Sequence, residues 1–281
     1  MECTPGSKRS RRLPGVAAII CCIAGLQGCG YLAKRILTTG PNGPETPASV
    51  GVPYERVAIP SGARSLDSYL VTAPANCADP PVLLIYHGVQ ETISLWVRAQ
   101  QYLYAHCVTS LVFDYTGSGD SSRPASLRAV NEDGVAAYAF ARSRFPENRV
   151  YVFGHSMGNG IMLDAIPRFS SRPTGVIVAN AFASLRAFAG RAGWFYGILA
   201  RLIPDWWDNV KGVTAIHAPL LVVASDADKV NPATDGQKIF AAAPEPKKFV
   251  LLHGFKHNAP YQAPDAAWWG STLEFVTTPA P

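Results

Sequence analysis

The sequence predicts an α/β fold, in which a mostly parallel sheet is flanked by helices on both faces. Apolar runs of strand length recur along the chain, and segments of helical length separate most of them. The runs are continuously apolar rather than alternating, which is typical of strands buried on both faces. Repetition of strand, helix and strand gives a doubly wound sheet. With 281 residues the chain is long enough for one such domain and a short extra segment.

The expected elements follow one another in a regular order. An antiparallel hairpin comes first, with strands at 55–60 and 66–72 on either side of Ser61-Gly62. The buried strands are expected at 82–86, 110–114, 150–153, 175–179, 220–224 and 248–252. The helices are expected at 94–105, 131–144, 158–169 and 233–242. In this order, a loop that follows a buried strand lies at the carboxyl edge of the sheet, where such folds place their sites.

One connection is longer than this pattern requires. Residues 184–213 carry the aromatic side chains Trp194, Phe195, Tyr196, Trp206 and Trp207. Long excursions inside a compact domain are often functional, so the segment is predicted to be an inserted helical lid that favours an apolar acyl group. The alternative is a pair of helices that packs on the core.

The N-terminus has the pattern of an export signal. A basic cluster precedes an apolar run from Val16 to Leu26, which predicts a signal peptide over residues 1–28. Leu26-Gln27-Gly28-Cys29 resembles the lipobox of bacterial lipoproteins, which implies lipidation of Cys29 and a membrane-anchored protein of the cell envelope that faces the periplasm or exterior. The alternative is an uncleaved anchor, because the run is shorter than the roughly 20 residues that span a membrane but could extend toward Leu37.

A domain boundary is expected close to residue 54. Residues 29–53 are predicted to form a flexible tether, because Gly, Pro, Thr and Ser dominate from Thr38 onward. The catalytic domain is then residues 54–278, with the lid at 184–213. A nucleic-acid partner is not expected, since the net charge is only +5 and the basic residues after the leader form no stripe.

Apart from the leader and Cys29, which is predicted to be lipidated, the chain has two cysteines, Cys77 and Cys107. Each precedes an expected buried strand, so both lie at the same end of the sheet. An even pair in an exported domain is what a disulfide requires. The spacing does not fix the distance between the two Cα atoms, so a pair of buried free thiols remains the alternative.

The strongest local motif is Gly154-His155-Ser156-Met157-Gly158, between a strand and a helix. This pattern is typical of a nucleophile elbow, a strained turn that raises a serine hydroxyl above the sheet edge. The glycines are needed because side chains there would collide with neighbouring backbone. Ser156 is therefore the predicted nucleophile.

A serine hydroxyl is a weak nucleophile, so the chemistry needs a general base and a carboxylate that orients it. Asp228 follows one buried strand and is the predicted acid, with Asp226 as the local alternative. His257 follows the next strand and is the predicted base, because His253 is too close to the strand end to reach back.

Acyl transfer also needs two preorganised amides for the oxyanion. Met157 supplies one, as the residue after the nucleophile. Val89 is predicted to supply the other, because Gly88 allows a sharp turn after the strand at 82–86. His87 lies inside that turn, where a supporting hydrogen bond is expected of it.

These motifs resemble the α/β-hydrolase superfamily, and within it the branch of ABHD-type, Bem46-like and serine aminopeptidase (S33) hydrolases. The resemblance covers roughly residues 55–275 and includes the elbow, His87-Gly88, residues 113–121, 228–232 and 243–248, and His257-Asn258. It implies an α/β-hydrolase fold with Ser156, Asp228 and His257 as the triad and Val89 and Met157 as oxyanion donors. One departure is Asn159, which stands where a second glycine often follows the elbow.

The predicted activity is hydrolysis of a carboxylic ester, or of a thioester or amide, through an acyl-enzyme. No metal or organic cofactor is needed for that chemistry. The expected partners are a small acyl substrate, lipid-like if the aromatic segment is a lid, and a membrane through the anchored N-terminus. The alternatives are acyl transfer to an acceptor other than water, with the same triad, and a noncatalytic binding protein that keeps the fold.

Overall fold

The computed structural model describes residues 34–278, apart from 192–197, 199–200 and 202–204. Within these ranges the strands form one sheet in the order β1-β2-β4-β3-β5-β6-β7-β8. β1 pairs antiparallel with β2 and β2 antiparallel with β4, whereas the other neighbours are parallel. The strands are β1 (Glu55–Ser61), β2 (Arg64–Val71), β3 (Val82–Tyr86), β4 (Thr109–Phe113), β5 (Val150–His155), β6 (Gly175–Ala179), β7 (Leu220–Ser225) and β8 (Lys247–Leu252). The predicted mostly parallel sheet is thereby confirmed.

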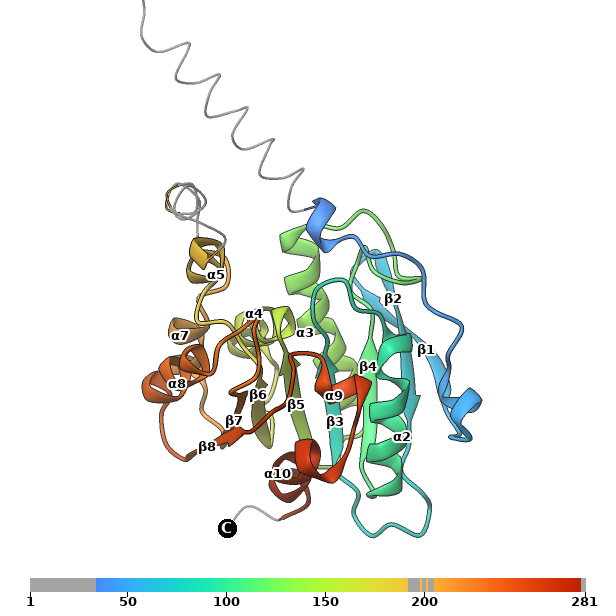
Figure 1. The fold of residues 1–281 in the computed structure, drawn as a ribbon. Helices are drawn as coiled ribbons and strands as arrows, with labels where there is room; N and C mark the ends of the chain where they lie inside the picture. The colour runs from blue at the N-terminus through green and yellow to red at the C-terminus, as the bar shows by residue number, and fades with distance from the viewer. Residues whose placement is uncertain (1–33, 192–197, 199–200, 202–204, 279–281) are drawn as a thin grey trace, which may run out of the picture.

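Helices cover both faces of the sheet (Figure 1). α2 and α10 pack on one face and α3, α4 and α8 on the other. The described α-helices are α2 (Val97–Ala105), α3 (Leu127–Arg144), α4 (Met157–Ala165), α5 (Leu185–Arg191), α7 (Asn209–Gly212), α8 (Ala233–Ala242), α9 (Ala259–Gln262) and α10 (Ala266–Thr277). Short 3-10 turns lie at η1 (Pro47–Val50), η2 (Ile93–Trp96), η3 (Ile166–Arg168) and η4 (Val213–Ala215).

Two hydrophobic cores explain why the strands are apolar throughout. In β3, Leu84 and Tyr86 face the core beneath α3 and α4, whereas Leu83 and Ile85 face the core beneath α2 and α10. Every residue of β3 is buried, because alternate side chains of a strand point to opposite faces and both faces are covered.

The segment expected to be a tether packs on the domain over its described part. Leu37 is 4% exposed and belongs to the core beneath α3. Asn42 donates a hydrogen bond to Asp67, with 3.0 Å between Nδ2 and Oδ2, and Pro47 is buried. The prediction of a flexible tether is therefore wrong for residues 34–53, because a few apolar and polar side chains find partners that a composition rich in glycine and proline does not reveal. The signal peptide and Cys29 lie outside the described residues.

Part of the predicted lid also lies outside them. Trp194, Phe195 and Tyr196 are not among the described residues, which include α5 and α7 at the two ends of the segment. Trp207 is 5% exposed and donates its indole N–H to Asn131, so this aromatic residue is part of the core. Within the described ranges, none of the helices combines the length and apolarity that crossing a membrane requires.

Cys77 and Cys107 form a disulfide in the structure, with their Cα atoms 5.6 Å apart. They precede β3 and β4, which are hydrogen-bonded neighbours, and this adjacency brings the two cysteines together. The bond therefore joins the amino ends of two parallel strands, at the edge of the sheet opposite the loops that follow the strands.

We expect the disulfide to stabilise the fold. It closes a loop of 30 residues, for which the loss of entropy in the unfolded chain predicts about 3–4 kcal/mol. A Cys77→Ser, Cys107→Ser double variant should unfold at a correspondingly lower urea concentration without reductant. Reductant should lower the midpoint of the wild type and leave that of the variant unchanged. Equal midpoints under oxidising conditions would contradict the expectation.

Candidate active site

Ser156 occupies the turn between β5 and α4. Its backbone has φ 53° and ψ −119°, a region that residues other than glycine rarely adopt. The Ser156 amide donates to the Ala179 carbonyl of β6 at 3.2 Å, which holds the turn against the neighbouring strand. The serine is 7% exposed at the carboxyl edge of the sheet. The motif therefore has the geometry of a nucleophile elbow.

The residues that follow Ser156 pack tightly against the neighbouring strands. A Cβ atom on Gly158 would lie 2.0 Å from the Tyr86 carbonyl oxygen, so only glycine allows α4 to approach β3 this closely. Asn159 is buried and donates from Nδ2 to the carbonyl oxygens of Ser156 at 3.0 Å and Ala179 at 2.9 Å. Asn159, which stands where a second glycine often follows the elbow, thus holds the turn against β6 by hydrogen bonds.

The three residues predicted to form the triad lie together. Ser156 Oγ is 3.0 Å from His257 Nε2, and His257 Nδ1 is 2.7 Å from Asp228 Oδ2. Because an ionised carboxylate only accepts, Nδ1 carries a proton and Nε2 is free to accept from the serine. Asp228 is 5% exposed, and its Oδ1 accepts from the amides of Val230 and Asn231 at 2.8 and 2.9 Å.

The alternative acid, Asp226, lies elsewhere. Its carboxylate accepts from the Gly254 amide at 2.8 Å and pairs with His253 Nδ1 at 2.6 Å, and neither partner belongs to the triad. The hydrogen bond from the Gly254 amide, and to a lesser degree the one with His253, holds the pKa of Asp226 below its usual value. Of the two aspartates in this loop, the structure brings Asp228 to the histidine.

The loop after β3 approaches Ser156 from the other side. A Cβ atom on Gly88 would lie 3.2 Å from the Ser156 Cβ atom, which shows how closely this backbone passes. Among the described residues, the amides of Val89 and Met157 have no hydrogen-bond partner. Met157 is the first residue of α4, where helix amides are free and the dipole favours negative charge. The backbone N–H groups of both predicted oxyanion donors are therefore free of other hydrogen bonds within the described residues.

Comparison with known sequences agrees with this architecture. A family described as serine aminopeptidase, S33, matches residues 80–212. An uncharacterized protein of Mycobacterium tuberculosis is 29% identical over 260 residues, 90% of either chain. The lysophosphatidylserine lipase ABHD12 of Rattus norvegicus is 27% identical over 223 residues, 68% of this chain and 55% of that protein. The chain thus spans about half the length of this lipase.

Solved structures give the same answer for the fold. An esterase of Pyrococcus furiosus superimposes with a TM-score of 0.68 at 16% identity, covering 85% of this chain and 96% of that one. Est1E of Butyrivibrio proteoclasticus has a TM-score of 0.61 at 20% identity, covering 78% and 96%. The chain has the α/β-hydrolase fold.

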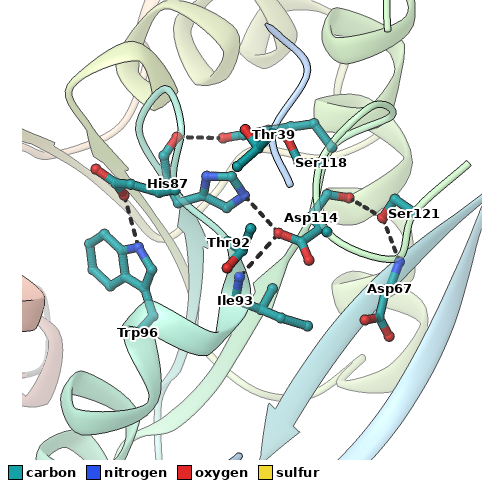
Figure 2. A network of polar contacts seen from close by, with 12 residues as sticks. Thr39, Asp67, His87, Thr92, Ile93, Trp96, Asp114, Ser118 and Ser121 are labelled. Carbon is teal, nitrogen blue, oxygen red and sulfur yellow. Dashed lines mark hydrogen bonds and ion pairs between the residues drawn. The ribbon is translucent and has the colours of Figure 1, made fainter. Parts of the chain in front are cut away.

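Within this fold, His87 supports the loop after β3, as the sequence predicted. Its Nδ1 lies 2.9 Å from the Gly88 carbonyl oxygen, and its Nε2 makes an ion-pair contact with Asp114 at 3.3 Å (Figure 2). Burial alone would lower the pKa of His87, but the hydrogen bond and charge of Asp114 outweigh burial and raise it. Asp114 also accepts from the Ile93 amide, so it ties the start of η2 to the same network.

A second buried pair, Glu91 and His155, was not singled out in the sequence. The Glu91 carboxylate lies 3.1 Å from His155 Nδ1, and both side chains are almost completely enclosed. Glu91 sits in a polar loop and His155 occupies the variable position of the elbow motif, so no local signal marks either residue. Within the described residues, no group of three or more His, Cys, Asp or Glu side chains is arranged to hold a metal ion.

The close contact at Gly158 gives a test of the elbow's packing. Gly158→Ala should destabilise the protein by about 3 kcal/mol in urea denaturation, because the new methyl group meets rigid backbone. Gly270→Ala is the matched control in a helix. Nothing lies within 4 Å of its added Cβ atom, so its stability should be unchanged or higher by up to about 1 kcal/mol. Similar midpoints for the two variants would show that α4 can move away from β3.

Proposed function

We propose that this chain is a serine hydrolase that cleaves a carboxylic ester through an acyl-enzyme, with Ser156, His257 and Asp228 as its triad. The observation that carries the proposal is the hydrogen-bonded series from Ser156 Oγ through His257 to Asp228, at 3.0 and 2.7 Å. Both distances are within the range that proton transfer and orientation of an imidazole require.

In the proposed reaction, His257 takes the proton of Ser156 as the hydroxyl attacks the substrate carbonyl. Asp228 holds the imidazole and balances the positive charge that develops on it. The oxyanion lies between the amides of Val89 and Met157, at the amino end of α4. His257 then returns its proton to the leaving alcohol, and water releases the acyl group by the same steps in reverse. Thioesters and amides could follow this path as well.

The substrate class is proposed from the surroundings of the site and from the relatives. The ABHD12 relative is named as a lysophosphatidylserine lipase, and one structural neighbour is named as an esterase. Val89, the predicted oxyanion donor, and Val230, two residues after Asp228, are 37% and 43% exposed, so apolar side chains are exposed on two of the catalytic loops. We therefore propose a lipid-like ester as substrate. Lipidation of Cys29 would hold the domain at a membrane of the cell envelope, where such esters occur.

The two aspartates of the acid loop provide a matched test of the triad. Asp228→Asn should lower kcat for p-nitrophenyl butyrate by about 10⁴-fold, because the amide favours the wrong tautomer of His257. Asp226→Asn removes a carboxylate from the same loop and should leave kcat within a few-fold of the wild type.

Labelling by a fluorophosphonate probe identifies the nucleophile in the same proteins. The wild type should be labelled and Ser156→Ala should not. Labelling of both proteins, or of neither, would refute the assignment of Ser156.

For the kcat comparison of the two aspartate variants, an Asp226→Asn variant as impaired as Asp228→Asn would refute the choice of acid.

Acyl chain length tests the substrate class. For p-nitrophenyl esters of two to twelve acyl carbons, kcat/KM should rise with length, because each methylene that the site removes from water contributes up to about 0.8 kcal/mol. A maximum at the acetyl ester would contradict a lipid-like substrate. The same assay with added alcohols distinguishes hydrolysis from transfer, since a transferase would form the new ester in preference to the free acid.

A further inference from the structure

Two loops that the proposed mechanism needs are joined by a buried bridge. The loop after β3 carries Gly88 and the predicted oxyanion donor Val89, and the loop after β8 carries His257. They lie far apart in the sequence and come from strands that are not neighbours in the sheet. Glu91 and His155 connect them, and neither belongs to the triad.

Glu91 holds the first loop. Its Oε2 accepts from the Gly88 amide at 2.8 Å and from the Trp96 indole N–H at 2.9 Å, while Oε1 faces His155 at 3.1 Å. A Cβ atom on Gly88 would lie 2.4 Å from Oε1, so the carboxylate lies directly against the backbone that precedes Val89. The residue is 5% exposed, and water cannot readily replace these contacts.

His155 holds the second loop. Its Nε2 donates to the backbone carbonyl of His257 at 3.0 Å, and a carbonyl oxygen can only accept. The ring is fully buried and lies with its centroid 4.9 Å from that of His257. Because His155 directly precedes Ser156, the same residue fixes the elbow, the base loop and, through Glu91, the oxyanion loop.

The charges of the pair follow from its surroundings. Burial alone would raise the pKa of Glu91, but the charge and hydrogen bond of His155 outweigh burial and lower it. Burial alone would lower the pKa of His155, but the charge and hydrogen bond of Glu91 outweigh burial and raise it. Both shifts favour the ion-paired form, a carboxylate beside an imidazolium, in which both ring N–H groups of His155 donate.

We propose that Glu91 and His155 are positioning residues for the hydrolase, which set the distance between the Val89 amide and the His257 imidazole by bridging the Gly88 amide and the His257 carbonyl. This inference rests on the proposed function, since it concerns the same reaction. Its physical basis is that the barrier to acyl transfer is sensitive to the placement of the base and the oxyanion donors. The bridge acts through its length and its hydrogen bonds rather than through net charge.

Two conservative variants separate length from charge. Glu91→Gln keeps the length, and its amide can donate to a neutral His155 whose Nε2 still donates to His257. Glu91→Asp keeps the charge but is one methylene too short to reach Gly88 and His155 together. For p-nitrophenyl butyrate we expect Glu91→Asp to lose about 10- to 100-fold in kcat with little change in KM, and Glu91→Gln to stay within about five-fold of the wild type.

The control is a carboxylate buried away from the triad. Asp133 accepts from Ser61 and from the Thr116 amide and is fully buried, so Asp133→Asn tests what the change of a buried acid does by itself. It should lower the unfolding midpoint while kcat stays within about three-fold of the wild type, since no catalytic loop moves. All assays are run at a temperature where circular dichroism shows each variant to be folded.

The outcomes separate the two proposals. A wild type that hydrolyses esters and reacts with fluorophosphonate, together with an unimpaired Glu91→Asp variant, would overturn the bridge alone. Loss of activity in Glu91→Gln equal to that in Glu91→Asp would also overturn it, since charge would then be decisive. A wild type that neither hydrolyses nor reacts would overturn the proposed function and this inference with it.

Discussion

The backbone conformation of Ser156 is the constraint around which the site is arranged. A residue other than glycine at positive φ costs about 1–3 kcal/mol, so the surrounding structure must hold it there. Three contacts supply that restraint. The Ser156 amide donates to Ala179, and the Asn159 side chain donates to the carbonyl oxygens of Ser156 and Ala179. Gly158 also packs closely against β3. Because these contacts come from β3, β6 and α4, the position of the serine hydroxyl depends on the packing of the whole centre of the sheet.

Much of the architecture could be predicted from sequence because it follows from burial and strand direction. β3 reads Val-Leu-Leu-Ile-Tyr without interruption, which only a strand between two cores requires. Once the sheet is parallel, the loops after β5, β7 and β8 share one edge, so candidates at 156, 228 and 257 are brought within reach of each other. The choice of Asp228 over Asp226 was a prediction from position, and the side-chain contacts agree with it.

The features that sequence missed depend on partners far apart in the chain. The segment from residue 34 to 53 has the composition of a linker, yet Leu37 enters the core because the domain offers it a site. Glu91 lies in a loop without periodicity, and its partner His155 is 64 residues away. The disulfide stayed one of two alternatives, since the distance between Cα atoms depends on β3 and β4 being neighbours.

The pairing of Glu91 with His155 also bears on the loop that carries His257. The carbonyl of His257 accepts from His155 and from Asn180 Nδ2, each at 3.0 Å, so its backbone is held from two directions. An imidazolium at His155 without a counterion would place a buried positive charge beside the base, since the two ring centroids are 4.9 Å apart. Glu91 cancels this charge while keeping the donor in place. A buried acid beside the site therefore allows a second histidine to hold the base loop without adding an unpaired charge next to it.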